Sequence, residues 1–410
     1  MSQKRMADLS TPKLRPGLDA ALGSDPETVI LSDRFRLGRP LVLSRAAFDL
    51  IRLFDGKKTL PVLQAESALM FEGKEVPLAT FENLVSGLDQ EFYLESPRLL
   101  DRLNQPDRPP SCIGCYDADP EKASKQLRKL FTAHGGAGMP GEPGCRVATE
   151  GPVRAILLPH MDYHRGGITF GWGFKELVER TDASLFVIIA TSHYSGHRFT
   201  LTRQNFTSPF GRVETDQGHI DRIVKHFGDG LFDDPFAHAP EHSIELEVVG
   251  MQFAFAGKRP FRIVPLLVGS FFDCVGDRTR PDEREDISLM IKALRLAEME
   301  CGESICYVIS GDLAHIGPKF QDEDLVDDEI LKHSRKQDDL LLAHAMAADA
   351  DGYFDTIAAE NDARRICGLP PTYLTLGAAK PTSGKLLHYG RFVHPEGFES
   401  VSFASMAFER

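Results

Sequence analysis

Short apolar runs that alternate with helix-like segments dominate the chain after residue 150 and constrain its fold more than any other feature. The runs at 154–158, 185–190, 262–268 and 304–309 have the length and continuous apolar character of strands buried on both faces. Helical spacing lies between most of them, and a last strand pair is expected at 386–393 and 400–409. The pattern predicts an α/β fold with a mixed, largely parallel sheet flanked by helices.

Side chains that can bind a metal or move a proton follow three of these expected strands. His160 follows the first strand, His193 follows the second, and Asp312 and His315 follow the fourth. Ligands of open α/β sheets bind beyond the carboxyl ends of the strands, so these side chains are expected to face one pocket. If the chain turns helical after residue 309, Asp312 and His315 lie three apart on one helix face and can point at the same atom.

Two further segments carry residues of the same kind. Glu241 and His242 open an apolar helix expected at 244–255, and Cys367 follows a helix that ends near Ile366. Each residue alone also fits a structural role, because acidic residues stabilise helix starts and buried polar groups are normally hydrogen-bonded. Histidines after three strand ends favour a site instead, since two imidazoles and one anionic ligand hold catalytic zinc and mononuclear non-haem iron.

The size and charge of the chain narrow the classes of protein that it can represent. Its 410 residues, 42% apolar and 26% charged, predict a globular protein with one large and one smaller domain. The net charge of −13 argues against nucleic acid or an anionic membrane as a partner. The polar start shows no apolar signal core and no run reaches membrane-spanning length, so we expect a cytoplasmic protein.

The seven cysteines fit reduced thiols better than a disulfide framework, because their number is odd and they are scattered. Cys112 and Cys115 form one CxxC motif, and Cys145 is the next cysteine. Zinc or cluster binding normally needs a second such pair. We therefore expect loop cysteines that can be oxidised.

The first 105 residues are expected to form a separate domain. Helical spacing is found at 44–54, 59–69 and 78–88, and a brief strand is expected around 92–94. Three small helices with a strand pair loosely resemble the winged-helix modules called PqqD-like domains, and a helical packing appendage is the alternative. The proline-rich stretch at 106–111 predicts a linker, and the α/β domain is expected at 112–410.

Six sequence blocks also resemble a known family. LLPHMDYHRGG, IIATSHYSG, EHSIELE, VPLLVG, SGDLAHIG and ICGLPP occur in the order and at roughly the spacing of the Memo family. Its bacterial and archaeal members are called AmmeMemoRadiSam system protein B. The resemblance covers residues 112–410 and leaves the N-terminal part outside.

The resemblance implies a fold similar to the class III extradiol dioxygenases and a site with iron or copper, zinc being a further possibility. The implied ligands are His160, His193 and Cys367. The implied catalytic neighbours are His315, Asp312, His242 and Glu241. It also implies radical-SAM and AMMECR1-like system partners, besides a small-molecule or peptide ligand of unknown identity.

The chain departs from the family pattern at Met161 and Asp162, at Tyr194 and at Ala314. These departures affect the surroundings of the site and leave the three implied ligands in place. A cysteine thiolate is a soft ligand that favours iron, zinc or copper over magnesium.

We therefore expect a dioxygenase-type or other redox metalloprotein. A non-catalytic module that holds a peptide or partner in a vestigial pocket is the main alternative. Zinc-dependent hydrolysis, with Glu241 as the base, is a third hypothesis.

Overall fold

The computed structural model describes residues 9–71 and 73–409. The chain divides into two compact units, one ending at Pro106 and one beginning at Asp107, which we call the N-terminal unit and the large unit. Each unit has a hydrophobic core of its own. No helix in these described stretches is long and apolar enough to cross a bilayer.

The N-terminal unit is a three-stranded antiparallel sheet followed by helices. The strands are β1 (Leu18–Leu22), β2 (Thr28–Asp33) and β3 (Leu41–Ser44), and the helices are α1 (Arg45–Ile51), α2 (Leu60–Met70), α3 (Leu78–Gln90) and α4 (Pro97–Leu103). Ser44 starts α1 because its hydroxyl accepts a hydrogen bond from the Ala47 amide. Residues 92–94, expected to be a strand, form only an isolated bridge between Leu14 and Leu94.

The sheet strands of this unit precede the helices, so the expected order of three helices and then a strand is wrong. β1 and β3 are only five and four residues long and neither has a buried residue, so their apolar signal is weak. The resemblance to PqqD-like domains remains a prediction.

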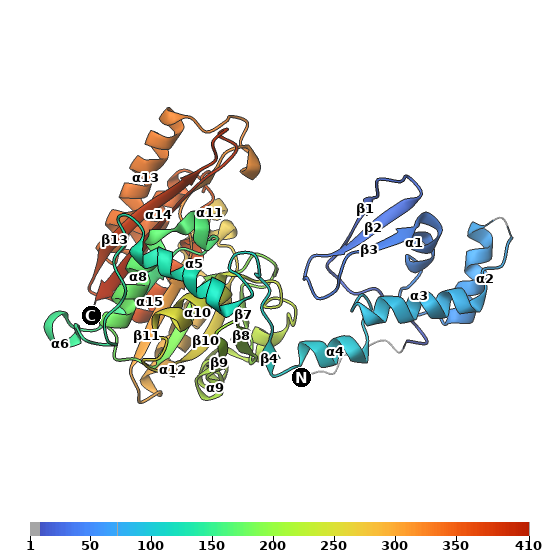
Figure 1. Ribbon diagram of the computed structural model, residues 1–410, viewed down its shortest axis with the longest axis horizontal. Helices are drawn as coiled ribbons and strands as arrows, with labels where there is room; N and C mark the ends of the chain where they lie inside the picture. The colour runs from blue at the N-terminus through green and yellow to red at the C-terminus, as the bar shows by residue number, and fades with distance from the viewer. Residues whose placement is uncertain (1–8, 72, 410) are drawn as a thin grey trace. The chain divides into compact units, whose positions relative to one another are not determined.

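The large unit is built on an 11-stranded mixed sheet (Figure 1). Its centre consists of β5 (Val153–Leu158), β11 (Ile305–Ser310), β6 (Leu185–Thr191) and β10 (Arg262–Val268), which are parallel neighbours in this order. On the other side of β5 lies the antiparallel β14 (Ser400–Glu409), paired with β13 (Ser383–Val393). The predicted mixed, largely parallel sheet is confirmed.

Helices cover both faces of this sheet because the side chains of each central strand alternate between two cores. In β6, Phe186 and Ile188 pack against the helices of one face, and Val187 and Ile189 pack against those of the other. The first face carries α5 (Pro120–Thr132), α8 (Ile168–Glu179) and α10 (Ser243–Ala254). The second carries α9 (Gln217–Phe227), α12 (Glu285–Met299), α13 (Asp328–Met346), α14 (Ala350–Ala359) and α15 (Leu369–Ala379).

Short elements complete the sheet and its connections. The strands are β4 (Asp107–Arg108), β7 (Phe199–Leu201), β8 (Asn205–Ser208), β9 (Gly211–Thr215) and β12 (His315–Ile316). The helical turns are α6 (Val147–Glu150), α7 (Tyr163–Gly166), α11 (Phe272–Asp277), η1 (Asp229–Phe232), η2 (Pro281–Glu283) and η3 (Pro318–Phe320).

The segment predicted to be a linker is packed into the large unit from Asp107 onward. β4 pairs with β8, and the Arg108 side chain forms a buried ion pair with Glu245 at 2.6 Å. Glu245 also accepts hydrogen bonds from the Ser111 and Cys112 amides and from the Tyr116 hydroxyl. A buried cation and a buried carboxylate stabilise each other. Arg108 and Glu245 are far apart in sequence, so the local proline-rich composition could not predict this ion pair.

The same segment holds a disulfide between Cys112 and Cys115, so the expectation of reduced thiols is wrong for this pair. The turn brings their Cα atoms to 5.7 Å, which lies within the range that a disulfide spans. The free cysteines of the described stretches are Cys145, Cys274, Cys301, Cys306 and Cys367.

We predict that Arg108→Met lowers the free energy of unfolding of the large unit by about 3 kcal/mol, because it leaves Glu245 buried without its cation. Urea unfolding followed by the fluorescence of Trp172, the single tryptophan, measures this change. Arg203→Met is the control, because Arg203 pairs with Asp221 at an exposed position. This substitution should lower the free energy of unfolding by less than about 1 kcal/mol. Equal effects of the two substitutions would contradict the assigned role of Arg108.

The stability that Glu245 contributes should also depend on pH. Burial opposes its ionisation, but Arg108, Tyr116 and Ser111 together lower the pKa of Glu245 below 4.5. Its contribution is therefore complete above pH 4.5 and is lost as the pH falls through the lowered folded-state pKa. In urea titrations, the stability difference between wild type and Glu245→Gln should shrink below that pH.

The pKa of Glu247 is shifted in the opposite direction from that of Glu245. Burial raises its pKa well above 4.5, so keeping its proton costs the folded state stability above that pH. The free energy of unfolding of Glu247→Gln, relative to that of wild type, should therefore be higher at pH 7 than at pH 4. A pH trend of the same sign for both variants would contradict these assignments.

Candidate metal centre

Three parallel strand ends bring the candidate residues together. In the paired register, Ser310 of β11 lies opposite Leu158 of β5 and Ala190 of β6. The loops that follow these strands therefore leave the sheet at one edge. His160 and Asp312 lie two residues past these paired positions and His193 lies three residues past, so the loops carry the candidate residues where the sequence predicted them.

His160 is at the centre of the cluster and is almost completely buried. Its amide donates a hydrogen bond to Asp312 Oδ1 at 3.1 Å, and its Nε2 lies 3.8 Å from Asp312 Oδ2. The same Nε2 lies 3.3 Å from Cys367 Sγ. The imidazole, the carboxylate and the thiol therefore converge on one point.

Cys367 reaches this point because two glycines allow its segment to approach the loop after β11. A Cβ atom added at Gly311 would lie 2.6 Å from the Gly368 Cα, and one added at Gly368 would lie 2.6 Å from the Asp312 carbonyl oxygen. The Gly368 amide donates to that oxygen at 2.9 Å, and the Asp312 amide donates to Cys367 Sγ at 3.3 Å. Larger residues at these two glycines would push the thiol away from His160.

Glu241 positions the other two histidines of the cluster. Its buried carboxylate accepts hydrogen bonds from the His193 amide at 2.7 Å and from His193 Nδ1 at 2.9 Å. Its Oε1 also lies 3.2 Å from His242 Nδ1. The two imidazoles stack at 4.8 Å, and the Nε2 atom of each is left for a ligand because Glu241 occupies both Nδ1 atoms.

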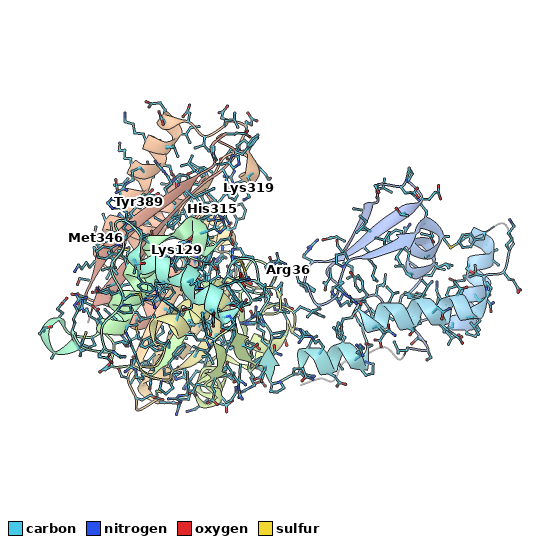
Figure 2. All side chains as sticks on the ribbon, in the orientation of Figure 1. Arg36, Lys129, His315, Lys319, Met346 and Tyr389 are labelled. Atoms are coloured by element: carbon cyan, nitrogen blue, oxygen red, sulfur yellow. A yellow bond between two sulfur atoms is a disulfide. The ribbon has the colours of Figure 1, made fainter. Side chains whose placement is uncertain are left out.

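His315 occupies a different place. Its Nδ1 donates to the carbonyl oxygens of Leu313 and Arg365 at 3.1 and 3.0 Å, so its proton is held on that nitrogen. Residues 311–314 are not helical, and β12 begins at His315, close to η3 and Lys319 (Figure 2). The conditional expectation that Asp312 and His315 share a helix face is therefore wrong, because the chain continues into a strand paired with β14.

Burial controls the charges in the cluster. Burial and the neighbouring His193 and His242 lower the pKa of His160 well below 6.5, which leaves a neutral imidazole. Burial raises the pKa of Cys367 above its usual range and that of Asp312 to about 7. Glu241 behaves differently, since His193 and His242 outweigh its burial and lower its pKa well below 4.5. A cation in this space would stabilise the ionised thiol and carboxylate.

Two groups of side chains in the described stretches have the spacing of metal ligands. One is His160, His193 and His242, and the other is His160, Asp312 and Cys367, with the ligand atoms of each group within 4.8 Å of one another. The two groups share His160. The predicted ligands therefore lie in this cluster, and His242 and Asp312, predicted as catalytic residues, lie at ligand distance in it.

Sequence reasoning missed the hydroxyl groups that support the cluster. Thr191 Oγ1 donates to the Cys367 carbonyl oxygen at 2.7 Å, and Ser310 Oγ lies 3.4 Å from His160 Nδ1. Both residues end a buried strand just before candidate ligands. That position is the signal that could have identified them.

Comparison with known proteins shows where this chain has relatives. The family model described as "Memo-like protein" matches residues 108–407. A protein of Aquifex aeolicus (strain VF5) named "MEMO1 family protein" is 23% identical over 393 residues, which cover 92% of this chain and 95% of the relative. A MEMO1 family protein of Methanopyrus kandleri is 26% identical over 314 residues, which cover 74% of this chain and 99% of the relative.

Proposed function

The chain belongs to the Memo-like protein family, and we propose that it is a metalloprotein with one metal ion held by His160, His193 and Cys367. One observation carries this proposal. The two groups with ligand spacing share His160, so an ion bound by His160 would lie beside the other members of both groups. His242 and Asp312 would then be further ligands or direct neighbours of the ion.

The surroundings of the proposed ligands favour this role. A metal-binding imidazole usually bonds its other nitrogen to a carboxylate, as His193 does with Glu241. His160 is neutral, which is the form that binds metal. The thiol of Cys367 lies against two main-chain groups of Asp312 and 3.3 Å from His160 Nε2, and a soft metal ion would complete its environment.

We propose iron or copper as the resident metal, with zinc as the third candidate, and a redox or dioxygenase-type activity. When bound, iron or copper would supply one-electron chemistry with oxygen or substrate. The residues of the chain would hold the ion and orient its ligands. Glu241 would keep the Nε2 atoms of His193 and His242 directed at the ion, and Asp312, with a pKa near 7, would accept or release a proton beside it.

The zinc-hydrolase hypothesis is less well supported by this arrangement. It requires Glu241 as a base that takes a proton from a bound water molecule. Both oxygens of Glu241 instead accept hydrogen bonds from His193 and from the start of α10. A peptide-binding role remains the alternative to be tested, and it predicts a chain without stoichiometric metal.

We predict that protein purified without oxygen carries about one equivalent of iron or copper per chain, and that His160→Ala and Cys367→Ser lose it. Elemental analysis by mass spectrometry measures this content. Cys306→Ser is the matched control, because Cys306 is a buried free cysteine of β11 outside both ligand groups. Full metal content in Cys367→Ser would remove that residue from the ligand set. If the wild-type protein holds no metal even after reconstitution, the metalloprotein proposal is contradicted and the peptide-binding alternative is favoured.

We predict that Glu241→Gln weakens metal affinity by about 10–100-fold, because it removes the carboxylate that orients two imidazoles. Competition with a chelator of known affinity measures the change. Glu247→Gln is the control, because Glu247 is a second buried carboxyl group close to Glu241 in sequence. Burial raises its pKa well above 4.5, and its oxygens form no hydrogen bond with either imidazole. A similar loss of affinity in both variants would show that the effect is general to α10 and not due to orientation by Glu241.

A further inference from the structure

A cavity of about 930 Å³ lies in the large unit away from the candidate metal centre. The C-terminal end of α10 and the loop to β10 form one side of it, and Pro209 and Phe210 of the β8–β9 turn and the outer face of α5 form the others. Glu241 and His242 lie at the opposite end of α10. At a rise of about 1.5 Å per residue, this helix separates the two places by roughly 18 Å.

The cavity is positively charged in an acidic protein. Its lining includes Arg128, Arg212, Lys258 and Arg259 and contains no Asp or Glu. The whole chain has 60 acidic and 47 basic residues, so a typical patch of its surface would show the opposite balance. The cavity should therefore attract anions.

Three of these cations form no direct ion pair among the described residues, although Arg259 interacts electrostatically with the nearby Asp182. Arg128 forms no ion pair there, and Lys258 Nζ donates only to the carbonyl oxygens of Pro140 and Gly141, at 2.8 and 2.5 Å. Arg259 donates to the carbonyl oxygens of Asp182 and Ala183, at 3.2 and 2.6 Å. These carbonyl groups hold the cations in position, and none of the three has a carboxylate oxygen as a hydrogen-bond partner in the described part of the chain. Arg212 differs, because it pairs with Asp107 at 3.1 Å.

Arg259 carries the clearest sign of a missing anion. Its Nε atom is buried and has no hydrogen-bond partner in the part of the chain that the structure describes. Burial also lowers the pKa of its guanidinium from the ordinary value. A buried donor without an acceptor is costly, and an anionic ligand beside it would relieve that cost.

Aromatic rings form the apolar wall of the same cavity. Phe210 lies 6.3 Å from Phe253, and Phe255 lies 5.6 Å from Phe261, measured between ring centroids. Phe210 and Phe261 are only partly buried, so their rings remain open to a ligand. Such rings bind a second flat ring by offset or edge-to-face contact.

We propose that this cavity binds a small organic anion that joins an aromatic ring to a phosphate, sulfonate or carboxylate group. Its volume lies within the range of small-molecule sites, which combine apolar walls with a few polar anchors. The unpaired cations account for the anionic group. The phenylalanine wall accounts for the aromatic ring of the ligand. An acidic protein segment would not require such a wall.

The test uses two fluorescent probes that share a ring system and differ in charge. 8-Anilinonaphthalene-1-sulfonate is the aromatic anion, and N-phenyl-1-naphthylamine is its uncharged analogue. Saturable binding of the anion to the folded full-length chain should be at least about fivefold tighter than binding of the uncharged analogue. Trp172 provides a second signal, because its Nε1 bonds to Gly135 at the start of the segment that carries Met139 and Pro140 of the cavity. Its emission should fall as the anion binds.

Charge reversal on α5 locates the site. Arg128→Glu should weaken binding of the anion by about fivefold, because it replaces attraction with repulsion. Lys129→Glu is the matched control, since Lys129 (Figure 2) is the exposed next residue of α5 and does not line the cavity. Arg128→Gln and Lys129→Gln form a second matched pair in case a reversed charge prevents folding.

Three results would overturn the proposal. They are equal affinities for the charged and uncharged probes, equal effects at Arg128 and Lys129, and tighter binding of a hexaglutamate peptide that displaces the probe. The last result would assign the cavity to an acidic segment of a protein partner.

Discussion

The parallel pairing of β5, β11 and β6 is the constraint on which the candidate metal centre depends. Because the three strands run side by side in one direction, the loops that follow them leave the sheet at one edge. His160 and Asp312 are thereby hydrogen-bonded although 152 positions separate them in sequence. The sheet thus assembles a compact group of ligands that no single loop contains.

Two neighbouring carboxylates then connect the centre with the rest of the large unit. Glu241 lies just before α10 and binds His193 and His242, whereas Glu245 lies in the first turn of α10 and binds Arg108 and the segment that follows it. Both stay ionised in a buried place because each has cationic or hydrogen-bonding partners. Glu247 has no cationic partner among the described residues, and burial raises its pKa well above 4.5. The partners, and not burial alone, decide the charge of each residue.

The basic cavity at the other end of α10 suggests a second use of the same helix. The loop after α10 carries a lysine and an arginine that form no ion pair in the described part of the chain, and the turn between β8 and β9 adds an aromatic ring. A ligand bound there would contact the end of a helix whose start orients two imidazoles. The cavity and the metal centre are nevertheless tested by separate measurements, because the residues of one do not contact those of the other.

Sequence alone determined the features that depend on local pattern. The central strands, α10 and the last strand pair follow from apolar periodicity, and the positions of His160 and His193 follow from strand ends. Tertiary structure decided the rest. The proline-rich composition around Arg108 predicts a linker, whereas the structure buries Arg108 against Glu245, which lies 137 positions away in sequence. The proximity of Cys367 to His160 and the position of the Arg259 guanidinium likewise depend on contacts between distant segments. Periodicity reports which face of an element is buried, but only packing decides what that face meets.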